Sequence, residues 1–272
     1  MNLSKLILRN LLYYRKPWLA VLAGVVISTA VLTGALIVGD SVRFSLHRMT
    51  ELRLGKTRYL LRANDRFFRQ ELTGAISNQS KTTVIPAIQS AGIAINSNKD
   101  LRINRVQITG VDNRFLTLWD QPFRMPGTDE AVISRNVAEK LMLKVGDDLL
   151  LRIQKQGKGL SNAPFASEKE PSASIRLTVS AIAEDENGGL FSMKNNQTAS
   201  YNVFLPLNQM AALLELPGFA NMLLVADNEN HRLQATFLDS TLMICWQPED
   251  IGVRFGEPDP VRVMDPVRVH QK

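Results

Sequence analysis

The sequence predicts an α+β fold class: a single N-terminal transmembrane helix with a stalk extension, followed by a mixed α/β extracytoplasmic domain. Two observations support this prediction. Residues 18–38 form a run without any charged side chain near the N-terminus of a chain of 272 residues. Beyond this run, short apolar segments rich in β-branched residues alternate with segments of helical periodicity.

The composition is that of a folded protein of one or two domains. Hydrophobic residues make up 45% of the chain and charged residues 21%, so a sizeable core can form and general disorder is excluded. A single cysteine, Cys245, cannot form an internal disulfide. With this one thiol and three scattered histidines, the chain cannot supply the ligands of a zinc finger, a zinc ribbon or an iron–sulfur cluster.

Residues 18–38 are long enough to span a bilayer. At about 1.5 Å per residue, an α-helix of this length covers the roughly 30 Å of hydrocarbon. Its polar side chains, Ser28, Thr29 and Thr33, can bond back to the helix backbone. A buried core helix is the alternative, but such helices are usually shorter. A cleaved signal peptide is another, but its apolar region is shorter and ends in a small-x-small site that this run lacks.

The charges around this segment indicate its orientation only in part. Lys5, Arg9, Arg15 and Lys16 precede it without any acid, but basic residues also follow it. The positive-inside rule applies to short segments, whereas a large domain crosses regardless of its charge. We therefore expect a cytoplasmic N-terminus and an extracytoplasmic main domain in the cell inner membrane.

Small residues recur along the apolar run. Ala20, Gly24 and Ser28 are spaced by four, and Ala30 and Gly34 repeat this spacing on another face. Such faces let a second helix approach closely, which predicts other transmembrane helices or a second copy of the chain as partners within the lipid bilayer. The alternative is that small residues are simply frequent in membrane helices.

Each flank of the apolar run has its own pattern. Residues 1–17 predict a cytoplasmic amphipathic helix lying in the interface and ended by Pro17, with an unstructured basic leader as the alternative. Residues 39–56 predict a helical stalk that continues to about Leu54 and stops at Gly55. We exclude nucleic acid as a partner of the basic residues between 41 and 70, because they follow a membrane span and no nucleic-acid module is recognisable. Lipid headgroups, an acidic partner face or solvent are the options left open.

Residues 57–240 are expected to form the mixed α/β domain. Helical periodicity appears at 67–76, at 135–143 behind a Ser134 cap and at 207–216 after Pro206. A turn is expected at 96–100 and a loop or mobile insertion at 156–174. The expected strands cover 59–62, 83–95, 101–110, 131–133, 148–153, 175–183, 201–205 and 222–226.

Catalytic chemistry is not indicated, and we predict no catalytic, cofactor-binding or metal-binding residues and no cofactor. Ser41 and His47 lie on the expected stalk, where nothing orients the imidazole, and His231 and His270 have no carboxylate at ligand spacing. Residues 184–189 lack the alternating oxygen ligands of a calcium loop and predict an acidic hairpin tip. Glycosylation sequons occur at 78–80 and 196–198, in a pattern short enough to arise by chance.

Three segments resemble a known family. GALIVGDSVRFSLHRMTELRLGKTRYLL at 34–61 resembles the first-helix exit of MacB/FtsX-like ABC transporter permeases. EAVISRNVAEKLMLKVGDDLLLRI at 130–153 is similar to the periplasmic core segment of that family, with a strand, a helix, a turn at Gly146 and Asp147, and a second strand. SAIAEDENGGLFSM and YNVFLPLNQMAALLEL, within 180–216, resemble the next part of the same domain.

This resemblance implies a permease subunit that transmits ATP-driven conformational change across the membrane to an extracytoplasmic domain. It implies a separate ABC ATPase subunit as partner and a second permease copy as dimer partner. The chain itself is then not an enzyme, because ATP hydrolysis belongs to the ATPase subunit.

The C-terminal part departs from the family pattern. Such permeases carry three or more further membrane helices after the external domain, whereas no second apolar span follows residue 226. Residues 241–272 include a near repeat, DPVRV at 259–263 and 265–269. We therefore expect an N-terminal fragment with a truncated C-terminal tail. The alternative is a single-span, membrane-anchored extracytoplasmic binding or scaffold protein.

Overall fold

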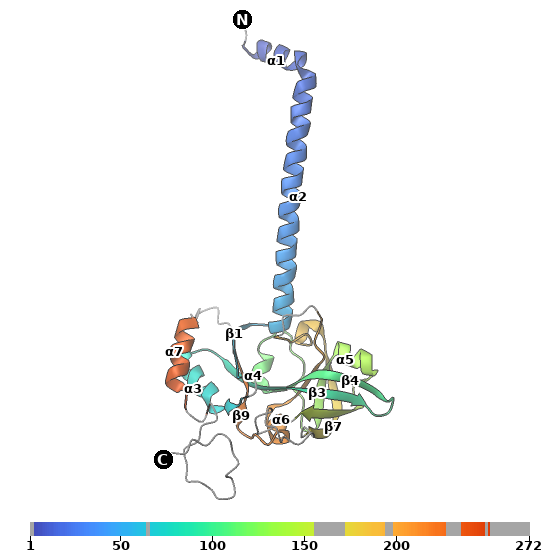
Figure 1. The fold of residues 1–272 in the computed structure, drawn as a ribbon, viewed down its shortest axis with the longest axis vertical. Helices are drawn as coiled ribbons and strands as arrows, with labels where there is room; N and C mark the ends of the chain where they lie inside the picture. The colour runs from blue at the N-terminus through green and yellow to red at the C-terminus, as the bar shows by residue number, and fades with distance from the viewer. Residues whose placement is uncertain are drawn as a thin grey trace, which may run out of the picture. The chain divides into compact units, whose positions relative to one another are not determined.

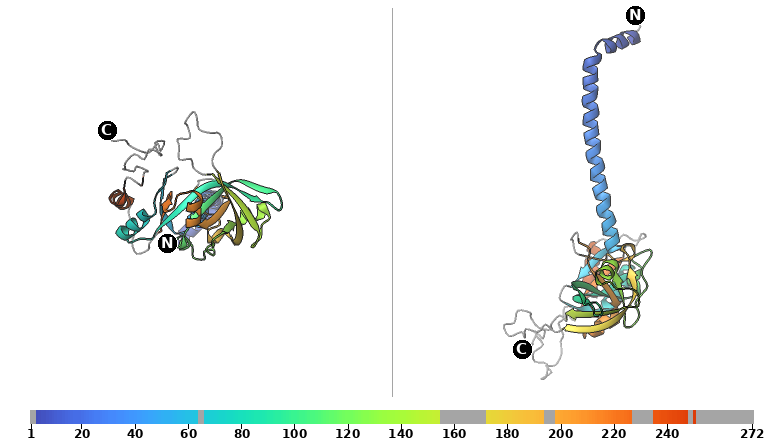
Figure 2. Two further views of the ribbon diagram at one scale, coloured as in Figure 1. Left: turned by 90° about the horizontal axis from the view of Figure 1, so that it is seen from below. Right: turned by 90° about the vertical axis from the view of Figure 1, so that its right-hand side faces the viewer.

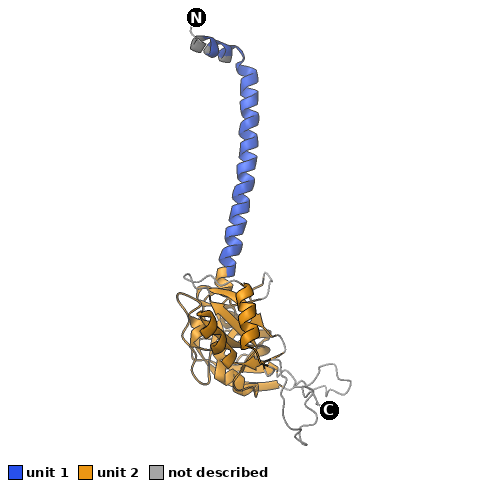
Figure 3. Cartoon of the chain, turned by 90° about the vertical axis from the view of Figure 1, so that its left-hand side faces the viewer, with its two compact units in different colours: residues 1–50 blue, residues 51–272 orange. Residues whose placement is uncertain are grey.

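The computed structural model describes residues 3–63, 66–154, 172–193, 198–226, 235–247 and 250. The chain divides into two compact units, residues 1–50 and residues 51–272 (Figure 3).

The first unit is helical. It contains α1 (Leu3–Tyr13) and most of α2 (Arg15–Leu54), whose 40 residues correspond to a length of about 60 Å. Among the described residues, α2 is the one helix long and apolar enough to cross a membrane, and none of its residues is buried. The hydroxyls of Thr29 and Thr33 donate to the carbonyl oxygens of Val25 and Thr29, which confirms the expected bonding back to the backbone.

The ends of these helices follow the sequence only in part. Pro17 was expected to end the first helix, and this is wrong: α1 ends at Tyr13, and Pro17 lies in the first turn of α2. A proline is tolerated there because the first amides of a helix have no partner within it. The expected helix end at Leu54 is confirmed, since Gly55 adopts the left-handed conformation with φ of 55°.

The second unit is a mixed α/β domain with two sheets and several short helices (Figure 1). Its strands are β1 (Thr57–Arg62), β2 (Phe68–Arg69), β3 (Val84–Asn96), β4 (Leu101–Val111), β5 (Glu130–Ser134), β6 (Asp148–Gln154), β7 (Ser172–Ala183), β8 (Asn202–Pro206), β9 (Phe219–Ala220) and β10 (Met222–Ala226). Its further helices are α3 (Glu71–Ser80), α4 (Asn113–Leu116), α5 (Arg135–Leu141), α6 (Leu207–Leu213) and α7 (Ala235–Cys245), together with the 3₁₀ turn η1 (Asp185–Asn187).

Six strands close into a barrel. The order is β3-β4-β8-β5-β7-β6, and β6 pairs again with β3. Closure is possible because β3 is long and uses one edge twice: residues 84–87 pair with β10, whereas residues 92–95 pair with β6. Strands β10 and β1 thus extend the sheet beyond the barrel (Figure 2). A closed barrel leaves no free edge for unwanted pairing.

The alternation of side chains along the strands builds two cores. In β8, Val203 and Leu205 face one core, and Phe204 between them faces the other. In β5, Ile133 faces the same core as Val203, and Val132 faces the same core as Phe204. Because successive side chains of a strand point to opposite faces, a single strand contributes to both cores. The larger core joins the barrel interior to α3, α5 and α6, and the smaller core is aromatic.

The expected helix at 67–76 is wrong in its first part. Residues 68–69 form β2, which pairs with β9, and α3 begins only at Glu71. Helix α7 was not predicted; it packs on α3 and crosses residue 241, the expected start of the tail (Figure 1). Periodicity failed here because both segments are short and their apolar residues are placed by tertiary contacts. The proposed division into domains stays a prediction.

Three local expectations also need correction. Ser134 precedes α5 as expected but makes no side-chain cap, since its hydroxyl bonds to Asn136 and to the backbone of Asn202. Helix α6 stops at Leu213, earlier than residue 216. Residues 184–189 do not form a hairpin tip, because β7 and β8 do not pair with each other, and η1 lies there instead. Residues 155–171 of the expected insertion lie outside the described part.

Candidate functional site: the junction of the long helix and the domain

The junction begins where α2 ends and β1 starts only two residues later. Within the second unit, the amide of Gly55 donates to the carbonyl of Glu51 at 2.8 Å, and the amide of Lys56 donates to the carbonyl of Leu118 at 2.9 Å. A side chain at residue 55 would place its Cβ 2.4 Å from the Leu118 oxygen and 3.0 Å from the Trp119 ring. Glycine is therefore required there both by φ and by space.

The surface that receives the helix end is an aromatic cluster. Phe115 lies at its centre, with its ring centroid 5.1 Å from that of Trp119, 5.1 Å from that of Phe191 and 5.9 Å from that of Phe204. Phe123 adds a contact to Phe204 at 4.8 Å. Each such pair contributes about 0.5–1.5 kcal/mol beyond the burial of its area, so the cluster stabilises this part of the domain.

Helix α4 positions this cluster. The carboxylate of Asp112 accepts hydrogen bonds from the amides of Arg114 and Phe115, and it forms an ion pair of 2.6 Å with the Arg114 guanidinium. This cap sets the turn from which Phe115, Leu118 and Trp119 enter the core. Helix α4 was not predicted from the sequence; the available signal was Asp112, a favoured cap residue three positions before the apolar pair Phe115 and Leu116.

The segment after β7 closes the cluster from another side. Asn202 donates to the carbonyls of Gly189 and Phe191 at 2.8 and 2.9 Å, and Gln107 donates to that of Phe191 at 3.1 Å. Gly188 adopts a φ of 99° beside the Trp119 ring. These buried amides fix Phe191 against Phe115, so that the residues once considered for calcium have a structural role. In the part of the chain that the structure describes, no group of three or more His, Cys, Asp or Glu side chains could hold a metal ion.

The helix end is also joined to the sheet. Strand β1 pairs with β10 so that Thr57 lies opposite Ala226, and β10 pairs in turn with β3 of the barrel. Lys56 forms an exposed ion pair of 2.5 Å with Asp120 at the same place. Residues 55–57 are therefore bonded through the backbone both to Leu118 beside the aromatic cluster and, through β10, to the barrel.

A second attachment holds the C-terminal side of the domain. Arg69 of β2 forms two hydrogen bonds of 3.0 Å with the carboxylate of Asp250, which also accepts from the amides of Arg69 and Gln247. Burial raises the pKa of Asp250, but the Arg69 hydrogen bond, the two backbone N–H groups and the Arg69 charge outweigh it, and the net pKa is lowered. A residue of the expected tail is thus part of the fold.

The other residues considered from the sequence are not brought together. Ser41 and His47 are exposed on α2, and Asn78 is exposed on α3. His231 and His270 lie outside the described residues, as does most of the sequon at 196–198.

Comparison with known proteins identifies the family. The family model of the MacB-like periplasmic core domain matches residues 18–236, most of the chain, and the chain belongs to this family. The resemblance stated from the sequence is therefore confirmed.

Two solved structures are similar to the chain at low identity. One is the periplasmic region of MacB from Actinobacillus actinomycetemcomitans, at 12% identity and a TM-score of 0.45, covering 71% of this chain and 83% of that chain. The other is the extracellular domain of the noncanonic ABC-type transporter YknZ from Gram-positive bacteria. It has 12% identity and a TM-score of 0.41, and the match covers 67% of this chain and 86% of that chain. No curated protein sequence matches the chain.

Proposed function

We propose that this chain is the N-terminal part of a permease subunit of an ABC transporter of the MacB/FtsX type. In this role it transmits ATP-driven conformational change across the membrane to its extracytoplasmic domain. One observation carries the proposal: the family match includes both the apolar segment from residue 18 and the barrel domain up to residue 236. The apolar helix and the barrel domain therefore belong to one family unit.

The junction supports a mechanical role. Helix α2 runs without interruption from Arg15 to Leu54, and only Gly55 and Lys56 separate it from β1. Within the second unit, Gly55 lies close to Leu118 and Trp119, so the residues that follow α2 are packed against the aromatic cluster. In this proposal α2 crosses the inner membrane with its N-terminus in the cytoplasm, and the domain lies outside.

The partners in this proposal are a separate ABC ATPase subunit and a second permease copy or other transmembrane helices. The exposed apolar side chains of α2 need lipid or other helices around them. ATP hydrolysis then belongs to the partner, and this chain contributes no catalytic residue.

The test is purification of the full chain from native membranes in mild detergent. We expect an ATP-binding subunit to co-purify, detected by photolabelling with azido-ATP and by Mg²⁺-dependent ATP hydrolysis. The matched control is a chain whose apolar residues 18–38 are replaced by an unrelated transmembrane segment of equal length, which should lose the subunit. Repeated absence of an ATP-binding partner would favour a single-span anchored binding or scaffold protein.

Orientation is tested separately with single cysteines. In a Cys245→Ser background, a cysteine at Ser4 should react only after the inner membrane is permeabilised. A cysteine at Asn78 should react with an impermeant maleimide in cells whose outer barrier alone is opened. The reverse pattern would overturn the proposed topology.

A further inference from the structure

The outer face of the barrel carries arginines in two cross-strand rows. In one row, Arg102 of β4, Ile95 of β3, Leu150 of β6 and Arg176 of β7 lie side by side, because Ile95 pairs with Arg102 and Leu150, and Leu150 pairs with Arg176. The next row, two residues along, places Asn104, Ile93, Arg152 and Ser174 next to one another in the same way. Arg102, Arg152 and Arg176 are exposed, and the isoleucines and Leu150 are partly exposed.

These arginines have no acidic partner within the described part of the chain. None of them takes part in the ion pairs that Lys56, Arg69, Arg114 and Arg135 form. Two acids lie on this face one row beyond Leu150 and Arg176, because Asp148 of β6 and Glu130 of β5 both pair with Thr178. Unpaired positive charge on a sheet face that also exposes aliphatic side chains is typical of an interaction surface rather than of a solvated one.

A fourth arginine adds an observation of a different kind. Arg105 is the extra residue of a β-bulge, since Gly92 pairs with Val106 and Ile93 pairs with Asn104. Its φ is 62°, in the left-handed region that glycine adopts at no cost. The bulge interrupts the alternation of side chains along β4 and leaves the Arg105 side chain exposed next to that of Asn104.

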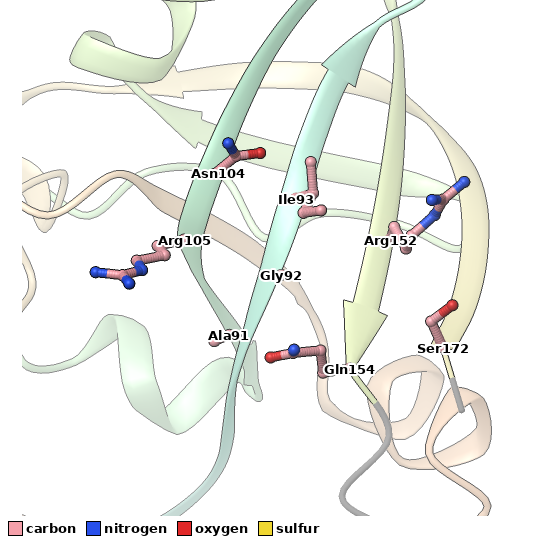
Figure 4. A pocket seen from close by; sticks show the side chains of 8 residues that line it. All are labelled: Ala91, Gly92, Ile93, Asn104, Arg105, Arg152, Gln154 and Ser172. Carbon is pink, nitrogen blue, oxygen red and sulfur yellow. The ribbon is translucent and has the colours of Figure 1, made fainter. Parts of the chain in front are cut away.

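The bulge borders a shallow hollow of about 290 Å³. Gly92, Ile93, Asn104, Arg152 and Gln154 are among the residues that line it (Figure 4). The side chains of Arg105 and Arg152 extend to opposite sides of β3 in this view. Two guanidinium groups that diverge cannot converge on one small anion, but they can hold two carboxylates of an extended chain.

We propose that this arginine face of the barrel, formed by Arg102, Arg105, Arg152 and Arg176, binds an acidic polypeptide segment of a partner protein. The arginine forks match carboxylates, and Ile93, Ile95 and Leu150 supply apolar contacts between them. A membrane surface fits less well, because this face offers no protruding aromatic side chain and its aliphatic residues are only partly exposed. This surface goes beyond the proposed transport role and stands independently of it.

The test measures binding of a fluorescein-labelled peptide of alternating glutamate and serine to the full chain in neutral detergent, by fluorescence anisotropy. We expect about twofold to fivefold weaker binding for Arg152→Gln, and about tenfold for Arg105→Gly with Arg152→Gln. The matched control, Arg124→Gln with Lys144→Gln, removes the same charge from exposed residues elsewhere in the domain and should change binding less than twofold.

Arg105→Gly separates binding from folding. It relieves the left-handed strain, so the thermal midpoint of the domain should stay constant or rise while peptide binding weakens. Equal losses in the test and control variants would show a non-specific charge effect and overturn the proposal. If the arginine variants bind phosphatidylglycerol vesicles less than the wild-type chain does but bind the peptide equally well, the surface binds lipid and the proposal is overturned. Competition by millimolar inorganic phosphate as strong as that by unlabelled peptide would overturn it in favour of a small anion.

Discussion

The long helix and the barrel domain are stable for different reasons. Residues 15–50 of α2 expose their apolar side chains, with Val31 at 68% and Leu32 at 62%, and no residue of α2 is buried. In the barrel domain, by contrast, residues such as Phe115 and Phe204 have 0% exposure. The helix satisfies its own backbone hydrogen bonds but needs apolar surroundings, whereas the domain supplies its own core.

This difference tells us where a substitution matters. A side chain on α2 has no tertiary contact within its unit, so its replacement should leave the domain unchanged. A side chain of the same type in the domain core contacts many neighbours, so its replacement should lower the free energy of unfolding of the domain. Matched pairs, one residue from each region, can test this comparison in the full chain, with unfolding followed by urea titration in detergent.

The largest effect is expected for Phe115→Ala. Phe115 is fully buried at the centre of the aromatic cluster, so its truncation removes a large apolar side chain and leaves a cavity. The free energy of unfolding of the domain should fall by about 3–5 kcal/mol. Phe44→Ala, at a residue of α2 that is 74% exposed, is the control and should change it by less than about 0.5 kcal/mol. Similar losses for both variants would contradict the comparison.

Gly55→Val should have the next largest effect. Valine at a φ of 55° is strained, and its Cβ would overlap the carbonyl oxygen of Leu118. We expect a loss of roughly 2–4 kcal/mol, together with a red-shifted tryptophan emission as Trp119 becomes exposed. Gly34→Val, on α2 where nothing lies within 4 Å, should leave both signals unchanged. An unperturbed Gly55→Val domain would show that the junction is flexible.

A smaller and pH-dependent effect is expected for Asp250→Asn. Because the pKa of Asp250 is lowered in the folded domain, its ion pair with Arg69 stabilises fully above the unfolded pKa of about 3.9. This contribution is lost as the pH falls through the folded value. At pH 7 the variant should be less stable than wild type by about 1–3 kcal/mol, and the difference should shrink towards pH 3. The control, Asp40→Asn on α2, should show no difference at pH 7, and a constant deficit for Asp250→Asn would contradict the linkage.

The smallest effect is expected for Trp119→Phe. The indole N–H of Trp119 is buried and has no hydrogen-bond partner in the described structure, so its removal offsets part of the lost packing. The free energy of unfolding should change by about 1 kcal/mol or less. Trp18→Phe, on the exposed surface of α2, should change it not at all. A loss above about 3 kcal/mol would mean that the indole ring itself holds the junction together.

Much of the fold could be predicted from particular residues. The apolar run at 18–38, the helix stop at Gly55 and the eight principal strands follow from local composition and alternation, because these depend on neighbours in sequence. The aromatic cluster could not be predicted, since Phe115, Phe191 and Phe204 come from three distant segments. The arginine face was equally hidden, because only the register of four strands brings Arg102 and Arg176 into one row.

The candidate membrane helix, its continuation to Leu54 and the class of the domain thus follow from local sequence. Length, hydropathy and period are properties of contiguous residues, and they suffice for elements that satisfy their hydrogen bonds locally. The pairing of one edge of β3 with both β10 and β6, which closes the barrel, depends instead on contacts between distant residues. Strand partners are chosen by packing between residues far apart in the chain, where no local pattern records the choice.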